Sequence, residues 1–422
     1  MKYFKKIKLK NNLDAYIIKL PHPSKVVYLD IIFENAIFYE KEKQIGSAHF
    51  LEHYLASFIN KKFKKEIEIQ GETRHQGMRL LFDIKSRGFE KKLEEILKIF
   101  AEPFEIDEEI LEKEKKILID ELTNSETDTE KQLINLGRKT FIKSPERLKH
   151  PVGGYPAHIK KLSGKDLIDF LKTLLANRTL KILIGIDKRK DTSSIESIIK
   201  KYLEKIKLLK KPFSVSKVIY NKKSILIKNW LYEKKIYILL NFPGPSLFDA
   251  IRDFYASGAF CRLFTGDRDY GVFKYLSDAG IYYGLKWYRK SFPGGGVVSF
   301  FTKTTYENFW AALKIIIAHF KTFRTKVIPK NKIKESFDIK DIKDSWSTNP
   351  HFYNWVLSDL LTSGKIITPS ETVKIINSLD NKDIQKVANN FKLKNCSIVI
   401  LGPKVEKLIK VDELKDYLES LK

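Results

Sequence analysis

The chain has 422 residues, of which 43% are hydrophobic and 31% are charged, and it carries two cysteines. These proportions are those of a globular protein and exclude a disordered chain, a collagen-like repeat and a disulfide-built scaffold. No apolar run reaches the roughly 18 residues of a membrane-spanning helix, so we expect a soluble, cytoplasmic protein without a membrane partner. The net charge is +26, but the lysines are spread along the chain without a nucleic-acid motif. We therefore expect a solvated basic surface and no nucleic-acid partner.

The first half of the chain is predicted to mix strands with helices. Runs rich in β-branched and aromatic residues predict strands at 14–20, 26–33 and 78–84. Apolar residues spaced three and four apart predict helices at 47–59, 88–101, 107–123, 128–142 and 164–176. A short buried strand is expected after the last of these helices, and it ends at Gly185.

The second half shows the same mixture. Strands are predicted near 224–240 and 295–303, and a short buried strand ends at Gly402. Helices are predicted near 246–264, 306–323, 351–362 and 382–391. Because strands and helices follow in mixed order and do not alternate strictly, we expect an α+β fold. Each mainly antiparallel sheet is expected to have helices packed on one face.

The chain resembles itself once, at an offset of 217 residues. Residues 163–185 align without a gap with residues 380–402, each copy being an amphipathic helix followed by a buried strand that ends at glycine. The predicted helices at 88–101 and 306–323 share the same offset. We therefore expect two homologous domains, at 1–208 and 217–422, joined by a basic linker at about 209–216.

One short motif points to metal chemistry. Residues 49–53 read His-Phe-Leu-Glu-His and lie in the helix that is predicted to begin after Gly46. On a helix, His49 and His53 lie one turn apart on the same face, where both imidazoles can reach one zinc ion at about 2.0–2.1 Å. Glu52 lies beside that position, where its carboxylate can take a proton from water.

A third ligand is predicted from the helix at 107–123. One stripe of this helix is apolar except for Glu114 and Glu121. Carboxylates on a buried stripe are costly unless they are paired or bound to a cation. Seven residues separate the two along the axis by about 10.5 Å, so we expect one to bind the ion and the other to orient a histidine. The spacing does not distinguish between them.

These residues resemble the pitrilysin-type, M16 metallopeptidases, which carry an inverted HxxEH zinc motif. The resemblance covers their full two-domain unit and implies a clamshell of two related α+β domains, the second without a metal site. It also implies one zinc ion per chain, held by His49, His53 and Glu121. Glu52 would then be the general base, and Glu114 would support a histidine ligand.

The residues that bind substrate in this family are matched less closely. In residues 276–283, Tyr283, or its neighbour Tyr282, fits the tyrosine that the resemblance implies for catalysis, but Ser277 stands where the family has arginine. Arg268 lies nearby in sequence, off the motif, and is kept as a substrate-binding candidate. His150 is another, because residues 150–154 are similar to the family's His-Pro-x-Gly loop.

The leading hypothesis is a zinc-dependent endopeptidase or oligopeptidase in which Glu52 activates the attacking water. Its substrate is expected to be an extended peptide that adds to a sheet edge near the strand at 26–33. The missing arginine motivates two alternatives: a zinc-bearing subunit of a heteromeric complex that needs a partner chain for substrate binding, or a non-catalytic assembly subunit. We expect a homodimer, or a heterodimer with a related chain.

Overall fold

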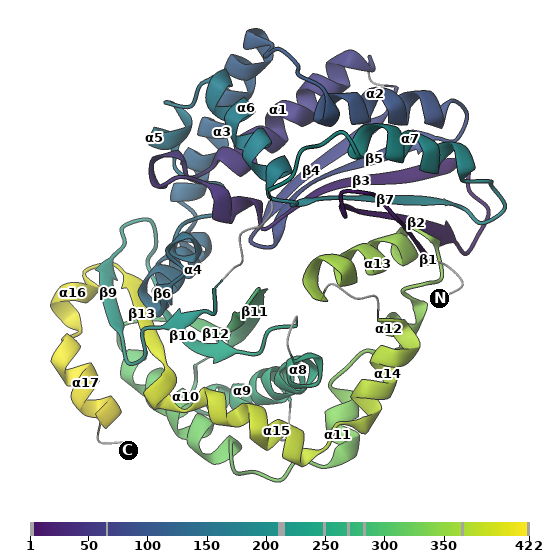
Figure 1. Ribbon diagram of the computed structural model, residues 1–422. Helices are drawn as coiled ribbons and strands as arrows, with labels where there is room; N and C mark the ends of the chain where they lie inside the picture. The colour runs from purple at the N-terminus through teal and green to yellow at the C-terminus, as the bar shows by residue number, and fades with distance from the viewer. Residues whose placement is uncertain are drawn as a thin grey trace. The chain divides into compact units, whose positions relative to one another are not determined.

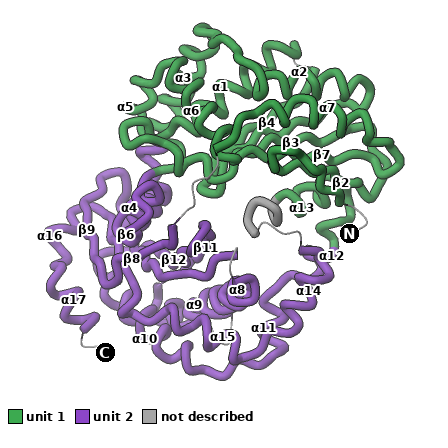
Figure 2. The backbone as a smooth tube through the Cα atoms, in the orientation of Figure 1, with its two compact units in different colours: residues 1–124, 151–214, 344–366 green, residues 125–150, 215–343, 367–422 purple. Residues whose placement is uncertain are grey.

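The computed structural model describes residues 4–64, 66–209, 216–247, 250–267, 271–281, 284–363 and 367–419 (Figure 1). The chain divides into two compact units (Figure 2). Unit 1 contains residues 1–124, 151–214 and 344–366, and unit 2 contains residues 125–150, 215–343 and 367–422. None of the helices in the described ranges is long and apolar enough to cross a lipid bilayer.

Unit 1 is built on a six-stranded sheet. In spatial order its strands are β1 (Phe4–Ile7), β2 (Asp14–Leu20), β7 (Leu180–Asp187), β3 (Val26–Glu34), β5 (Gly77–Lys85) and β4 (Glu68–Arg74). Only the β2–β7 pair is parallel, so the sheet is mainly antiparallel, as predicted. The strand predicted at 26–33 is β3, which lies inside the sheet between β7 and β5. A peptide therefore cannot add to β3 itself, because the edges of this sheet are β1 and β4, and β5 separates β4 from β3. Addition to one of these edges stays a prediction.

Helices cover one face of this sheet (Figure 1). They are α1 (Ser47–Lys62), α2 (Phe89–Ala101), α3 (Glu108–Glu126), α5 (Pro156–Ile159), α6 (Gly164–Ala176) and α7 (Ser193–Leu203), together with the 3₁₀ turns at Ala36–Tyr39 and Glu42–Gln44. Alternate strand residues point to these helices, among them Ile17 of β2 and Leu29 and Ile31 of β3, and all three are buried in one apolar core.

The opposite face of the sheet is covered by one helix from the second half of the sequence, α13 (Asn349–Ser363). Tyr16, Ile18 and Leu20 of β2 pack there against buried residues of α13. The approach is close at Gly185 of β7, where a Cβ atom would lie 2.6 Å from the ring of Tyr353. The helix at 351–362 was predicted, but its position on a second sheet face was not.

Unit 2 repeats the arrangement with five strands. In spatial order they are β11 (Lys286–Phe292), β12 (Gly295–Thr304), β10 (Ile236–Gly244), β13 (Ser397–Gly402) and β9 (Ile225–Asn229). Only β13 and β9 pair in parallel, so the order and strand directions match those of β4-β5-β3-β7-β2 in unit 1. The single strand predicted near 224–240 is two strands, β9 and β10. The predicted α+β fold class, with mainly antiparallel sheets and packed helices in two related units, is confirmed.

The helices of unit 2 pack on both faces of its sheet, as α13 does on the second face in unit 1, so the prediction of helices on one face only is wrong for both sheets. One apolar core includes residues of α8 (Ile251–Gly266), α9 (Val272–Asp278), α10 (Phe309–Phe323) and α15 (Asn381–Ala388). The other face carries α4 (Thr129–Phe141), whose Leu133 packs with Tyr237 and Leu239 of β10. The remaining helices are α11 (Lys330–Glu335), α12 (Ile339–Asp344), α14 (Pro369–Ser378), α16 (Val405–Leu408) and α17 (Val411–Glu419), and the short strands β6 (Ile142–Ser144) and β8 (Ile219–Tyr220) pair.

The compact units depart from the predicted continuous ranges 1–208 and 217–422 at two places. Residues 125–150, which include α4, belong to unit 2, and residues 344–366, which include α13, belong to unit 1. Shifted by the repeat offset of 217, the first segment falls on 342–367, so the two halves exchange equivalent segments. Of the predicted linker at 209–216, residues 210–215 lie outside the described part of the chain.

Candidate metal centre

Helix α1 is fixed in place by its apolar residues and by a close contact at its start. Phe50, Leu51 and Tyr54 are buried in the core of unit 1, which sets the rotation of the helix about its axis. The residue before the helix, Gly46, has φ of 109°, and a Cβ atom there would lie 2.7 Å from the carbonyl oxygen of Gly153. Glycine at this position therefore lets the loop at 153–154 pack against the start of the helix.

Three side chains in unit 1 bring ligand atoms together. His49 and His53 of α1 and Glu121 of α3 each offer an atom, and these atoms all lie within 4.8 Å of one another. The two imidazole rings are 4.8 Å apart between centroids at an interplanar angle of 87°. The Nε2 atom of His53 lies 3.7 Å from Oε2 of Glu121, whose side chain is 56% exposed. Two imidazoles and one carboxylate are a ligand set that zinc uses in catalytic sites, so these residues fit the ion.

Glu114, the other glutamate of the α3 stripe, contacts the Nδ1 atom of His53. Glu114 is buried, and its Oε2 lies 3.4 Å from Nδ1 of His53. The hydroxyl of Ser57 donates a hydrogen bond of 2.7 Å to Oε1 of the same carboxylate. A carboxylate placed on Nδ1 fixes the ring orientation and leaves Nε2 for an ion. The two glutamates that the sequence spacing could not distinguish thus occupy different places around one histidine.

Glu52 lies on the other side of the group, in a confined position. Its Oε2 is 3.9 Å from Nε2 of His49 and accepts a hydrogen bond of 3.1 Å from the hydroxyl of Thr73 on β4. A Cβ atom at Gly71 of the same strand would lie 1.8 Å from Oε1 of Glu52. Burial raises the pKa of Glu52 to about 7, although the neighbouring His53 opposes the shift.

The imidazole of His49 is held neutral by its surroundings. Burial, with a further contribution from the charge of His53, lowers the pKa of His49 to about 4. A neutral ring at physiological pH has a free nitrogen lone pair, as a metal ligand requires. At Gly153, a Cβ atom would lie 3.1 Å from Nδ1 of His49 and 2.8 Å from the side chain of Leu122. Glycine therefore lets the backbone pass against this ring.

Of the other predicted site residues only His150 lies in the described part of the chain, and it is not a member of this group. His150 belongs to unit 2 and follows the 3₁₀ turn Glu146–Lys149, with its Nε2 atom 3.6 Å from Oε1 of Glu146. Burial lowers the pKa of His150. Tyr282, Tyr283 and Arg268 lie outside the described residues.

Sequence reasoning did not identify Ser57, Thr73 or Gly71 as parts of the site. Ser57 follows His53 by four residues, so helical spacing places both on one face and offered a signal. Gly71 and Thr73 are two residues apart on a strand and therefore share a face. That strand, β4, was not predicted because its residues are mainly polar and largely exposed or half-buried.

Comparison with known sequences finds related proteases. No family model matches the chain. Over 415 residues the chain is 22% identical to an uncharacterized zinc protease of Rickettsia felis, a match that covers 94% of this chain and 97% of that protein. It is 26% identical over 145 residues to the human mitochondrial-processing peptidase subunit beta, a match that covers 32% of this chain and 29% of that subunit.

Comparison with solved structures finds the same fold. A protease from Helicobacter pylori superposes with a TM-score of 0.77 at 16% identity and covers 95% of this chain and 99% of that one. A peptidase M16 inactive domain from Pseudomonas fluorescens gives 0.79 at 12% identity, covering 95% and 98%. A chain of complex III2 from Candida albicans gives 0.79 at 14% identity, covering 98% and 99%. The fold is thus shared by a protease, an inactive M16 domain and a chain of complex III2.

Proposed function

We propose that the chain is an M16-type, zinc-dependent endopeptidase or oligopeptidase that hydrolyses extended peptides. The observation that carries the proposal is the convergence of His49, His53 and Glu121, whose ligand atoms lie within 4.8 Å of one another, beside the buried carboxylate of Glu52. These are the zinc ligands and the base that peptide hydrolysis requires. The related zinc protease of Rickettsia felis supports the same assignment.

In the proposed mechanism His49, His53 and Glu121 hold one zinc ion. The ion supplies Lewis acidity, which polarises a carbonyl group and makes water more acidic. Glu52 takes the proton of the attacking water at its carboxylate and then delivers it to the leaving amine. Thr73 orients Glu52 through the hydrogen bond to Oε2, and Glu114 orients His53 through Nδ1.

The peptide is proposed to bind along β4. This strand pairs with β5 on one side and is an edge of the six-stranded sheet, so its other side offers backbone donors and acceptors to an added strand. Gly71 of β4 comes close to the carboxylate of Glu52, so a peptide paired with this strand would pass the proposed base. Binding at a strand edge requires the peptide backbone to be extended. The preference for particular peptide side chains then depends on the protein residues beside the strand.

The test compares Glu52→Gln with the unchanged chain and with Glu90→Gln, which alters an exposed glutamate of α2. Zinc content is measured by elemental analysis, and hydrolysis with a library of internally quenched peptides, with and without a chelator. We expect Glu52→Gln to keep one zinc ion per chain and to lose hydrolysis, because the variant retains the three ligands but not the base. Hydrolysis at the wild-type rate in Glu52→Gln would contradict the mechanism.

A second candidate function is a zinc-bearing subunit that hydrolyses peptides only together with a related chain. It is motivated by Ser277, which stands where the family has arginine, and by relatives that are a peptidase subunit beta and a chain of complex III2. Purification from the native source, followed by the same peptide assay, tests it. Hydrolysis by the chain alone excludes it, hydrolysis only with a copurified related chain supports it, and no hydrolysis in either sample points to an assembly role.

A further inference from the structure

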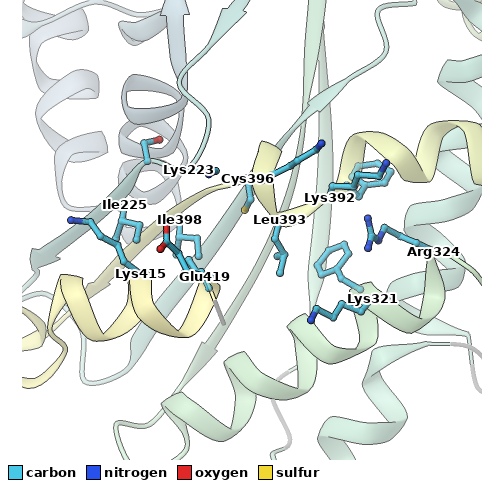
Figure 3. A pocket seen from close by; sticks show the side chains of 15 residues that line it. Lys223, Ile225, Lys321, Arg324, Lys392, Leu393, Cys396, Ile398, Lys415 and Glu419 are labelled. Carbon is cyan, nitrogen blue, oxygen red and sulfur yellow. The ribbon is translucent and has the colours of Figure 1, made fainter. Parts of the chain in front are cut away.

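A cavity of about 480 Å³ lies within unit 2, whereas the metal centre belongs to unit 1. Five parts of the chain border it: the end of α10, helix α17, strand β9, strand β13, and the segment 391–396 (Figure 3). Its volume falls in the range of about 300–1,000 Å³ that is usual for small-molecule sites. None of the residues in the proposed mechanism lines this cavity.

The wall of the cavity is apolar. Phe320, Phe391 and Ile398 are buried, and Ile225 and Leu418 are half-buried. The ring of Phe391 stacks on Phe260 of the core with 4.4 Å between centroids, so this part of the wall is continuous with the core of unit 2. Such a wall favours a ligand with a hydrocarbon body, because apolar surface gains free energy when it leaves water.

The lining is also strongly basic. Its cations are Lys223, Lys321, Arg324, Lys392, Lys394 and Lys415, and its one carboxylate is Glu419. Lys415 pairs with Asp412 at 3.2 Å, but the other five cations have no carboxylate within ion-pair distance among the described residues. These six cations all line one apolar cavity.

Two of these cations lie at the end of one helix. Lys321 is in the last turn of α10, Arg324 is the residue that ends the helix, and both side chains are half-buried (Figure 3). Burial lowers the pKa of Arg324, and no neighbouring carboxylate offsets this cost. A bound anion would supply the missing partner.

From this combination we propose that the cavity is a binding site for an anionic amphiphile, a free fatty acid whose alkyl chain lies on the apolar wall and whose carboxylate pairs with Lys321 and Arg324. An inorganic anion would leave the wall exposed to water, and a neutral lipid would leave the cations unpaired. A fatty acid satisfies both parts of the site. The proposal does not depend on peptide hydrolysis.

The experiment measures the binding of dodecanoate to the full chain by isothermal titration calorimetry, below the concentration at which dodecanoate forms micelles. Dodecanol tests the need for the charge, acetate tests the need for the chain, and vesicles with anionic phospholipids test a membrane source of the same chemistry. We expect saturable binding of one dodecanoate per chain and much weaker binding of dodecanol and acetate. Tight binding to the vesicles without binding of free dodecanoate would overturn the proposal.

Two variants test the location. The double change Lys321→Gln and Arg324→Gln should weaken dodecanoate binding about tenfold, since it removes two partly screened charge pairs. The matched control Lys330→Gln and Lys340→Gln removes two exposed lysines of unit 2 that do not line the cavity, and it should leave the affinity unchanged. Ile225→Trp should block the alkyl chain while circular dichroism reports an unchanged fold. Equal affinity in all variants, or an equal loss in the control, would refute the site.

Discussion

Replacing Gly71 by alanine should move the carboxylate of Glu52 and leave the proposed zinc ligands in place, so it tests the position of Glu52 alone. The new Cβ atom would lie 1.8 Å from Oε1 of Glu52, so the carboxylate must withdraw by roughly 1.6 Å to reach the 3.4 Å of an ordinary contact. A shift of about 1 Å in a catalytic group can cost on the order of 100-fold in rate, so we expect at least that loss of peptide hydrolysis. His49, His53 and Glu121 are not displaced by the new methyl group, and zinc content should stay at one ion per chain.

The cost in stability should be small, because the colliding atom is the end of a flexible side chain and Gly71 lies in an edge strand. We expect the free energy of unfolding of Gly71→Ala to remain within about 1 kcal/mol of wild type. The matched control is Gly266→Ala at the end of α8, where a Cβ atom meets nothing within 4 Å. The assay pairs hydrolysis of quenched peptides with zinc analysis and urea unfolding. Wild-type hydrolysis in Gly71→Ala would show that the position of Glu52 does not control the reaction.

Three further predictions concern unit 1. Glu121→Gln should reduce the zinc retained after dialysis about tenfold or more, since it removes a ligand carboxylate, and retention of one ion would refute its role. Glu114→Gln should weaken zinc affinity about 10- to 100-fold in a competition titration with a chelator, because it loosens His53, and unchanged affinity would contradict this. Asp30 is buried and burial raises its pKa to about 7, so the folded state holds a proton that the unfolded chain loses near pH 4. The free energy of unfolding should therefore fall as the pH rises from about 4 to 7, by up to about 4 kcal/mol, and urea unfolding of Asp30→Asn should lack this dependence; parallel curves would show another cause.

The residues of the candidate metal site were largely predictable because they follow local rules. The spacing of His49 and His53 places them on one helical face, and their closeness in sequence needs no knowledge of the fold. The choice between Glu114 and Glu121 was not available from spacing, because it depends on how α3 packs against α1. Only the family resemblance favoured Glu121, whose Oε2 atom lies 3.7 Å from Nε2 of His53.

Two features could not be predicted from the sequence: that β4 is the sheet edge proposed to bind the peptide, and that a helix covers the second face of the unit 1 sheet. Strand β4 has no apolar alternation, so its role as an edge depends on pairing with β5 and not on its own pattern. The strand at 26–33 reads as the stronger strand because both of its faces are buried, and for that reason it lies inside the sheet. The spacing of apolar residues likewise predicts the helix at 351–362, but it does not predict that this helix packs in unit 1.

The exchange of α4 and α13 between the halves has a consequence for how the protein matures. During synthesis, residues 1–208 emerge before α13, which begins more than 140 residues later in the chain. Until α13 is made, the second face of the unit 1 sheet has no helix packed on it. Neither half of the sequence supplies all the parts of its own compact unit, so we expect the halves, separated at the seam, not to fold independently. Proteolysis between the halves would therefore leave two fragments, each of which retains a segment that belongs to the compact unit of the other.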